Sequence, residues 1–429
     1  TAGFALVGAL LLAGALWLPP LLAAGLAGLS RLARRRPLGQ WALADLQLQL
    51  PRLALPLMAL LIALSANLGV SSMVGGFRLT FLDWLDQRLV ADLYFRPPPA
   101  QYDEIDAWLA GRPEVRERLA TRRVEATLVA VQAGDDAPRP RARPMSAYGI
   151  TPGEALVPHW PLLETHDGRQ AAWQAFREGA AFINEQLAIA EGLAPGDRLT
   201  LSAPGRHEPT RETLEVVAIY PDYGNPRGEV LLATPELARR FAAPPGTLGL
   251  VLAEGAEAGA LGDALAARFA LPRDTLRDQR EVKRLATAIF ERTFTITRAL
   301  GALTLGVAAL ALLASLLAQA RERRRRLAPL WALGVPRTRL AAVQLAQLGG
   351  AALVTGLLAL PLGIALAWGL VAIINVAAFG WRLPLYLFPG AMALTLATAV
   401  AVALAAAALP VLRLWRTPPR ALLAEEELA

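Results

Sequence analysis

The three histidines of this 429-residue chain are the first residues to examine, because imidazole can bind a metal ion or transfer a proton. They are His159, His166 and His207, and they lie in stretches rich in proline, glycine or charged residues. Their spacing does not match H-E-x-x-H, the helical arrangement that presents two histidines to zinc. We therefore interpret them as exposed loop residues and predict no metal site.

The sequence also lacks the motifs that mark nucleophilic catalysis and nucleotide binding. It contains no cysteine, so neither a thiolate nor a disulfide can form. No G-x-S-x-G motif marks a serine nucleophile. Lys283 is the only lysine, and its context "QREVKRLA" lacks the glycine-rich turn of a P-loop. We predict a chain that is not an enzyme, binds no cofactor and does not hydrolyse nucleotide through a P-loop.

The apolar residues gather in blocks that can cross a membrane. Charge-free runs cover residues 1–30, 53–77, 299–320, 340–381 and 383–412. A helix rises about 1.5 Å per residue, so each run can span roughly 30 Å of hydrocarbon. The run 340–381 could hold two spans, or one long span bent at Pro361. Two spans would place Arg413, Arg416 and Arg420 outside the cytoplasm, so we expect one span there, and therefore about five in all.

Polar side chains within these runs are few and uncharged. They are Asn67, Ser71, Ser72, Ser315, Gln344, Gln347 and Asn375. Ionisable residues inside a membrane usually mark ion or proton pathways, so their absence disfavours a proton-coupled carrier. We interpret the polar residues as helix–helix hydrogen-bonding groups rather than substrate contacts.

The net charge of +7 is a topology signal rather than a nucleic-acid footprint. Basic residues next to the spans stay in the cytoplasm. They cluster after the first and third runs, at Arg31, Arg34, Arg35, Arg36, Arg321, Arg323, Arg324, Arg325 and Arg326. This pattern predicts a multi-pass membrane protein, with residues 78–294 as one large domain outside the cytoplasm.

The sequence of the extracytoplasmic domain predicts an α+β fold. We predict helices from the second span to about residue 97, at 102–119, at 256–269, and at 277–294 leading into the third span. The stretch "AFINEQLAIAEGLAPGDRLTLS" predicts strand, short helix, turn and strand, since Pro195, Gly196 and Asp197 favour a turn. Strands are also predicted at "VEATLVAVQ", "TLEVVAIY", "EVLLAT" and "TLGLVLA", and a helical turn at "PELARRF".

The basic segment after the third span, "RERRRRLAPLWALG", contains apolar residues as well as arginines. Arginines here anchor the inner interface and can contact anionic lipid. The leucines and the tryptophan that follow form an apolar helix face, and Gly334 and Pro336 end that helix and begin the next. A short helix with an apolar face and a basic rim predicts a docking element, and the segment around Trp41 before the second span is similar.

These stretches resemble the FtsX/MacB-type ABC permease domain. The resemblance covers the arginine-rich segment, the glycine-rich span after it, and the core of the external domain from "FINEQLAIAEG" to "ATPEL". It implies a separate cytoplasmic ATPase and a place in a bacterial inner membrane, with the large external domain in the periplasm. The candidate docking residues for the ATPase are Trp41, Leu43, Leu46, Glu322, Arg323, Arg326, Leu330, Trp331, Leu333 and Gly334.

The resemblance also gives a division into modules. Residues 1–36 would be the last span of a preceding module, because "LSRLARRRPLGQ" repeats the pattern of "LPVLRLWRTPPR". Many cytoplasmic span ends are basic, however, so the repeat alone leaves that open. Residues 37–77 would hold a cytoplasmic helix and a span, 78–294 a MacB-like core domain, and 295–429 an FtsX-like permease domain with three spans and a tail. The chain would be the C-terminal half of a double-length permease.

The implied function is coupling of ATP hydrolysis by the partner to export, extraction or mechanotransmission outside the membrane. A lipid-linked or hydrophobic substrate, as in lipoprotein export, is the expected cargo. Membrane lipids and a periplasmic protein are further expected partners, and nucleic acid is not. The alternative is an extracytoplasmic sensor or regulator without transport.

Overall fold

The computed structural model describes residues 2–32, 37–205, 208–223, 225, 227–272, 275–320, 322, 326, 330 and 333–416. These residues form two compact units, each with its own hydrophobic clusters. The first unit comprises Thr1–Phe77, Arg292–Ile374 and Pro384–Ala429. The second comprises Arg78–Glu291 together with Asn375–Leu383.

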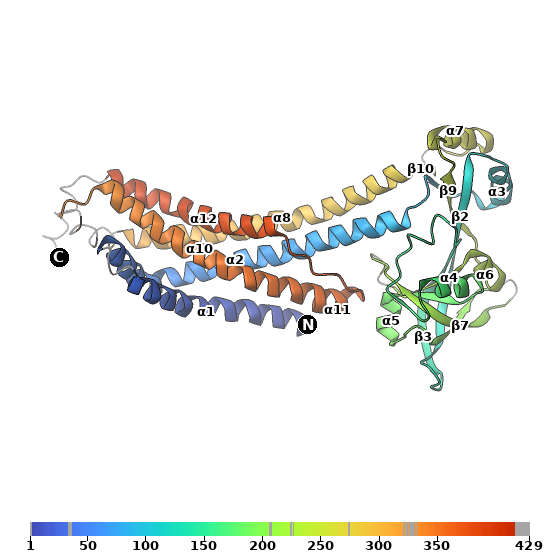
Figure 1. The fold of residues 1–429 in the computed structure, drawn as a ribbon, viewed down its shortest axis with the longest axis horizontal. Coiled ribbons are helices and arrows are strands. Elements are labelled where there is room, and N and C mark those ends of the chain that lie inside the picture. Colours follow the sequence, from blue (N-terminus) through green and yellow to red (C-terminus); the bar gives the residue numbers. More distant parts are fainter. Residues whose placement is uncertain are drawn as a thin grey trace. The chain divides into compact units, whose positions relative to one another are not determined.

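The first unit is a bundle of long apolar helices (Figure 1). Among the described residues, 5 helices are long and apolar enough to cross a membrane, which confirms the predicted number. They are α1 (Ala2–Leu32), α2 (Pro37–Arg88), α8 (Gln279–Ala318), α10 (Arg337–Gly369) and α12 (Pro389–Arg416). Their buried leucines and alanines form one cluster, to which α2 contributes Leu53, Leu60 and Leu64.

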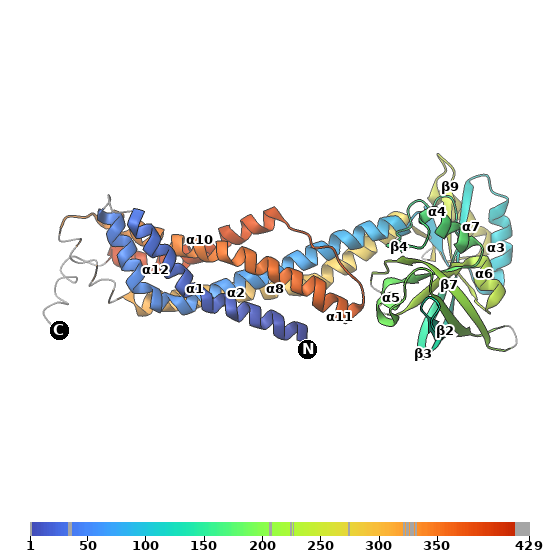
Figure 2. The same cartoon turned by 60° about the horizontal axis from the view of Figure 1, so that its bottom comes forward.

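The run before Trp381 forms one continuous span, as predicted. α10 passes through Pro361 and continues into a π-helical segment (Leu370–Asn375) and the short helix α11 (Val376–Phe379). Within the first unit, α10 contacts α1 and α12, and the view in Figure 2 also shows α10 beside them.

Glycines bring α2 and α10 into close contact. A Cβ atom at Gly363 would lie 2.9 Å from the side chain of Leu68, and one at Gly69 would lie 2.6 Å from that of Leu366. A larger residue at either position would force the two helices apart. Small residues at helix contacts are the usual means by which membrane helices pack, because lipid provides no hydrophobic drive for association.

The second unit is built on a mixed 10-stranded sheet. The strands are β1 (Leu93–Phe95), β2 (Val115–Gln132), β3 (Arg139–Ile150), β4 (Glu164–Thr165), β5 (Ala181–Asn184), β6 (Arg198–Ala203), β7 (Thr210–Tyr220), β8 (Glu229–Ala233), β9 (Pro245–Leu252) and β10 (Arg277–Asp278). Since β6 pairs with both β2 and β7, the pairings close a ring in the order β2, β3, β8, β5, β7 and β6. A closed ring removes the exposed edges at which sheets aggregate.

Helices cover this sheet. They are α3 (Tyr102–Ala110), α4 (Arg169–Arg177), α5 (Glu185–Glu191), α6 (Thr234–Arg240) and α7 (Ala258–Phe269). Helix α5 starts at Asn184, whose side chain accepts a hydrogen bond from the Leu187 N–H at 3.1 Å, and it ends at Gly192 with φ of 68°. The left-handed conformation at this position favours glycine. The predicted order of strand, helix, turn and strand is confirmed here.

Two helix predictions were too long. Helix α2 ends at Arg88 rather than near residue 97, because the chain then joins the sheet through the Asp92 N–H, which bonds the Leu250 carbonyl, and through β1. Helix α3 ends at Ala110 rather than Leu119, because Val115–Gln132 pairs with β9, β3 and β6. In both places, pairing with strands distant in sequence overrides a local helical pattern.

Candidate functional site

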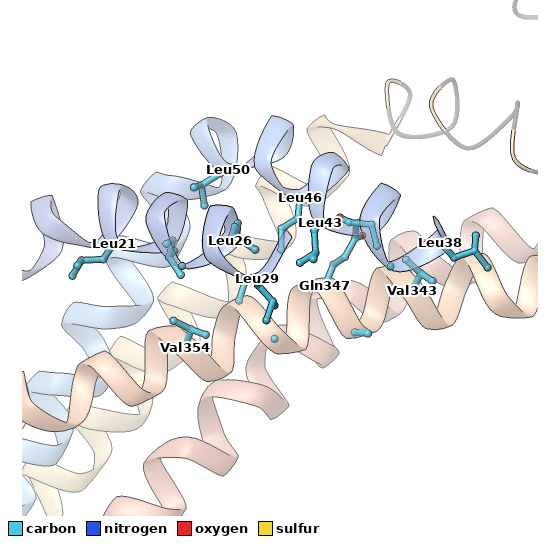
Figure 3. A pocket seen from close by; sticks show the side chains of 17 residues that line it. Leu21, Leu26, Leu29, Leu38, Leu43, Leu46, Leu50, Val343, Gln347 and Val354 are labelled. Atoms are coloured by element: carbon cyan, nitrogen blue, oxygen red, sulfur yellow. The ribbon is translucent and has the colours of Figure 1, made fainter. Parts of the chain in front are cut away.

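The first turns of α2 hold three predicted docking residues. Leu46 is 5% exposed and packs in the helix cluster, and Leu43 lines a cavity between α1, α2 and α10 (Figure 3). Trp41 is half-buried. Most of the apolar surface of this segment therefore faces the bundle, and Leu48, which is 68% exposed, is a large apolar side chain on its outer surface.

A buried carboxylate holds this segment in place. Asp45 is 8% exposed and accepts hydrogen bonds from the side-chain amides of Gln49 and Gln347, the second at 3.3 Å. The Gln347 amide also donates to the Ala42 carbonyl at 2.7 Å. Arg326 compensates the charge, with its Nη1 atom 3.5 Å from Asp45 Oδ1. A carboxylate is tolerated at low exposure only when its charge and its lone pairs are matched in this way.

Glu322 extends the network to the residues after α8. It forms ion pairs with Arg52 of α2 and with Arg326, the second at 2.5 Å. Near the end of α8, the Ser315 hydroxyl donates to the Arg52 carbonyl at 3.2 Å. Together with Asp45, these groups join α2, α10 and the segment after α8. The two segments predicted to dock a partner are thus fixed relative to each other by one polar network.

The described members of the second predicted docking segment differ in exposure. Leu333 is 82% exposed, whereas Glu322 and Arg326 are partly buried in the network. The Leu330 carbonyl accepts a hydrogen bond from the Val335 N–H at 3.1 Å, and Gly334 has φ of 90°, as the predicted helix end requires. Arg323 and Trp331 lie outside the described residues. Leu333 is therefore accessible to a partner, while Glu322 and Arg326 position the segment.

In the second unit, the end of α2 is fastened to the loop between β7 and β8, residues 221–228. The Trp84 indole N–H donates to the Pro221 carbonyl at 3.1 Å. Arg88 forms an ion pair with Asp222 at 2.9 Å, with side-chain exposures of 16% and 7%. The Arg88 guanidinium also lies over the ring of Trp160, 4.3 Å from its centroid. Such an ion pair is sensitive to loss of either partner, because the other is then left buried and uncompensated.

The segment Asn375–Leu383, between α10 and α12, meets the same loop. Trp381 is 4% exposed, and its ring packs edge-on against Tyr223 at a centroid distance of 6.3 Å. The Arg382 N–H donates to Glu185 Oε2 of α5 at 3.1 Å. Gln186 of α5 donates in turn to the Asp222 carbonyl at 2.6 Å. The 221–228 loop is therefore the place in the second unit where α2 and the α10–α12 connection are both anchored.

Beside this loop lies a cavity of about 490 Å³, whose lining includes Arg88, Trp160 and Glu229. Glu229 is 2% exposed and accepts hydrogen bonds from the Tyr220 hydroxyl at 3.0 Å and from Arg123 at 2.7 Å. Burial raises the pKa of Glu229 above its ordinary value of 4.5, and the nearby Asp222 raises that pKa further, while Arg123 and Arg88 act in the opposite direction.

Glu229→Gln is expected to flatten the pH dependence of stability of the second unit. With its raised pKa, the folded carboxyl keeps its proton to higher pH than the unfolded one. Its contribution to stability is complete below the ordinary value of 4.5 and is lost as the pH rises through the folded pKa. We expect the wild-type unfolding temperature to fall relative to that of the variant from about pH 4.5 to neutral. Thermal unfolding of the purified chain at several pH values measures this difference.

Glu236→Gln is the matched control, because a hydrogen bond from Arg239 lowers the pKa of Glu236. The contribution of Glu236 is present above its ordinary pKa of 4.5 and is lost as the pH falls through its folded pKa, so its removal changes the slope in the opposite sense. If the unfolding temperatures of wild type and Glu229→Gln change in parallel with pH, the result would contradict a raised pKa of Glu229 in the folded chain.

The sequence did not single out the residues of this second site. Arg88, Asp222, Glu229 and Trp381 carry no motif, and they lie in separate parts of the chain. The prolines and glycines of residues 221–228 are typical of a loop, but they do not indicate what the loop contacts. The partners of these residues follow from the tertiary fold.

No group of three or more metal-binding side chains occurs among the described residues. The His159 ring nitrogen Nδ1 lies 3.1 Å from the Ala155 carbonyl, and His166 lies 3.9 Å from Asp167. His207 is outside the described residues. The described side chains of this site interact through ion pairs, aromatic packing and apolar contacts.

The C-terminal part of the chain matches a known protein family. Residues 298–419 match the family described as FtsX-like permease C-terminal, and they include most of α8 and the whole of α10 and α12. Residues 298–419 are therefore similar to an FtsX-like permease domain, and this range is called the permease domain below. The polar network therefore lies partly in this permease domain, through Glu322, Arg326 and Gln347, and partly in the α2 segment that precedes it.

Two further similarities extend beyond the permease domain. The chain is 31% identical over 414 residues to an uncharacterized ABC transporter permease protein, Rv0987, of Mycobacterium tuberculosis, covering 93% of this chain and 46% of that protein. The chain thus spans about half the length of this relative. The periplasmic region of MacB from Actinobacillus actinomycetemcomitans matches with a TM-score of 0.29 and 9% identity, covering 46% of this chain and 92% of that one.

Proposed function

We propose that this chain is the non-catalytic, membrane-spanning part of an ABC transporter whose ATPase is a separate cytoplasmic protein. The observation that carries the proposal is the match of the permease domain, together with the 31% identity to an ABC transporter permease. The polar network around Asp45 and Glu322 supports it, because this network joins the start of α2 to the segment after α8. Leu333, which follows that segment in sequence, is exposed. Leu333 and Trp41, with Arg323 and Trp331, are the proposed ATPase contacts.

The work done by the transporter is proposed to take place outside the membrane. Helices α2 and α8 each continue without a break between the two units. An unbroken helix transmits displacement along its axis, and α2 ends on the 221–228 loop through Trp84 and Arg88. Nucleotide-driven movement would thereby reach the second unit. Export or extraction of a lipid-linked or hydrophobic substrate, or mechanotransmission, is the proposed use of that movement.

Because the chain lacks cysteine, single introduced cysteines can report its orientation in the membrane. Asp136→Cys, in the exposed turn between β2 and β3, is expected to react with a membrane-impermeant maleimide in intact spheroplasts. Leu333→Cys is expected to react only after the membrane is broken, since the arginines before it stay inside. Labelling in the reverse order would place the second unit in the cytoplasm and overturn the proposed orientation.

Co-purification tests the proposed partnership. The tagged chain, extracted from native membranes in a mild detergent, is expected to retain an ABC-type ATPase identifiable by mass spectrometry. ATP hydrolysis is expected from the complex and not from the chain after the partner has been removed. Recovery of the folded chain with no ATPase, or ATP turnover by the chain alone, would contradict the proposal.

A further inference from the structure

The cavity beside the 221–228 loop lies wholly within the second unit, at about 490 Å³. This volume falls in the range of roughly 300–1,000 Å³ that small-molecule sites occupy. Strands β1, β2, β3, β8 and β9 contribute to its wall, together with the end of α2 and the loop itself. The side chain of the lining residue Arg123 is 54% exposed, so the cavity opens to the surface beside it. A small molecule can therefore reach it from solvent.

Aromatic side chains form much of this wall. The aromatic lining residues are Trp84, Tyr94, Tyr148 and Trp160, and leucines and an isoleucine lie between them. Aromatic rings of this kind pack against the apolar surface of a ligand, while their N–H and O–H groups bond to its polar atoms. The cavity therefore suits a ligand that has an apolar face and polar groups around it.

The charged groups of the cavity are already matched to one another. Arg88 pairs with Asp222 at 2.9 Å, and Arg123 pairs with Glu229 at 2.7 Å, so two arginines balance two acids. Asp222 also accepts a hydrogen bond from the Asn225 amide at 2.8 Å. A charged ligand would find no unpaired opposite charge among these lining residues. Because a charge taken out of water needs such a partner, a neutral ligand is favoured.

Hydrogen-bond donors of the lining remain available. Trp160 is 3% exposed, and its indole N–H has no hydrogen-bond acceptor among the described residues. A buried donor without an acceptor is destabilising, and an acceptor on a ligand removes that penalty. Arg123 donates through Nη2 to Glu229, and a guanidinium carries five N–H groups in all. The site therefore favours a ligand rich in oxygen acceptors.

We propose that this cavity is a binding site for a neutral saccharide of one or two rings. A saccharide ring has an apolar C–H face that packs on aromatic side chains, and its oxygens accept hydrogen bonds from indole and guanidinium groups. It adds no charge to a lining whose charges are paired. A purely apolar ligand would also pack on the rings, but it would leave the Trp160 N–H without an acceptor.

Occupancy of this site would act on the end of α2. Trp84 and Arg88 line the cavity, and the same two residues hold the end of α2 to the 221–228 loop. A sugar in contact with them stabilises this attachment, because a ligand favours the state that binds it. The inference does not rest on the proposed function, since it requires neither an ATPase nor movement of the chain.

Binding of sugars to the full chain tests the site directly. The chain is purified in a detergent without a sugar headgroup. The probes are glucose, galactose, N-acetylglucosamine, maltose and N,N′-diacetylchitobiose, measured by isothermal titration calorimetry and by saturation-transfer NMR. We expect at least one of them to bind at one site per chain, with a dissociation constant of about 1 mM or lower. Absence of binding by all of these probes would overturn the proposal.

Charged analogues test whether the site prefers a neutral ligand. The amino and the uronic-acid analogues of the sugar that binds keep its ring and add one positive or one negative charge. We expect each analogue to bind at least about tenfold more weakly than the neutral sugar, because the charges of the lining are already paired. Equal or tighter binding of either analogue would contradict a neutral occupant.

Two pairs of variants test whether the sugar binds in this cavity. Thr247→Phe adds a ring to the wall in β9, and phenylalanine is favoured in strands. Its control is Thr127→Phe, because Thr127 is exposed on β2 and does not line the cavity. Trp160→Phe removes the indole N–H and keeps an aromatic ring. Its control is Trp173→Phe, whose indole N–H is likewise buried without an acceptor among the described residues, but which does not line the cavity.

We expect Thr247→Phe to abolish sugar binding and Trp160→Phe to weaken it at least about fivefold, while both controls bind as the wild type does. Trp160→Phe is expected to lower the unfolding temperature without sugar no more than Trp173→Phe does. The rise of that temperature on addition of sugar should be smaller in Trp160→Phe alone. Unchanged affinity in either cavity variant, or equal losses in the controls, would overturn the proposal.

Discussion

Replacing Leu333 with aspartate is expected to reduce the ATPase recovered with this chain by at least about thirtyfold. Leu333 is 82% exposed, so the change does not disturb the packing of the chain itself. At a docking surface, however, the new carboxylate would be buried without a partner. Such a defect costs about 2–5 kcal/mol, and each 1.4 kcal/mol is a factor of about ten in affinity. The ratio of ATPase to chain after affinity purification measures the effect.

Thr338→Asp is the matched control for this prediction, because it adds the same charge at an exposed site in the first turn of α10. An aspartate there is favourable to the helix N-terminus and should leave ATPase recovery near the wild-type level. Equal losses in both variants would indicate a general effect of negative charge. Full recovery with Leu333→Asp would remove Leu333 from the proposed interface.

Arg88→Ala is expected to detach the end of α2 from the 221–228 loop while leaving ATPase association intact. The substitution leaves Asp222, with a side chain 7% exposed, buried without its cation, and it removes the guanidinium from the Trp160 ring. Loss of one partner of a buried ion pair costs about 3–5 kcal/mol. We expect a lower unfolding temperature for the second unit and loss of any ATP-dependent structural change there, measured with a fluorophore on Arg227→Cys.

Two milder variants keep this prediction testable if Arg88→Ala folds poorly. Arg88→Lys retains the charge but not the planar guanidinium that lies on the rings, so an intermediate response is expected. Trp84→Phe keeps an aromatic ring and removes the hydrogen bond to Pro221, a loss of about 0.5–1.5 kcal/mol. A wild-type response in all three variants would show that this contact does not transmit movement.

The membrane spans could be predicted because their signal is local. An uninterrupted apolar run has one stable outcome in lipid, so the spans followed from composition, and the number of spans in the run 340–381 needed a further argument. The single span through Pro361 followed from the charge rule applied to the residues after it. The strand–helix–turn–strand unit at Ala181–Ala203 could also be predicted from local sequence. Asn184 and Gly192 mark the two ends of its helix, and Pro195–Asp197 marks the turn.

Contacts between distant segments were not predictable in the same way. The early end of α2 depends on β1 pairing with β9, more than a hundred residues later. The contact between Trp381 and Tyr223 likewise joins two residues far apart in the sequence. No periodicity in the sequence marks such pairs.

The docking segments were found by their amphipathic pattern, but the pattern misread what some of their residues do. Leu43 and Leu46 face the bundle, and Glu322 and Arg326 are engaged with Arg52 and Asp45. An apolar stripe shows that a face is covered, without showing by what. Leu333 is a described residue for which exposure and the predicted role agree.

The ATP response of the second unit is the most direct test of the account that this chain converts a partner's ATP hydrolysis into movement outside the membrane. The measurement is the fluorescence of an environment-sensitive label on Arg227→Cys, within the 221–228 loop, in vesicles that contain the chain and its ATPase. We predict a change on addition of ATP that requires the ATPase and is absent with Arg88→Ala. A label that does not respond to ATP while the complex hydrolyses it, or that responds equally without the ATPase, would contradict the account.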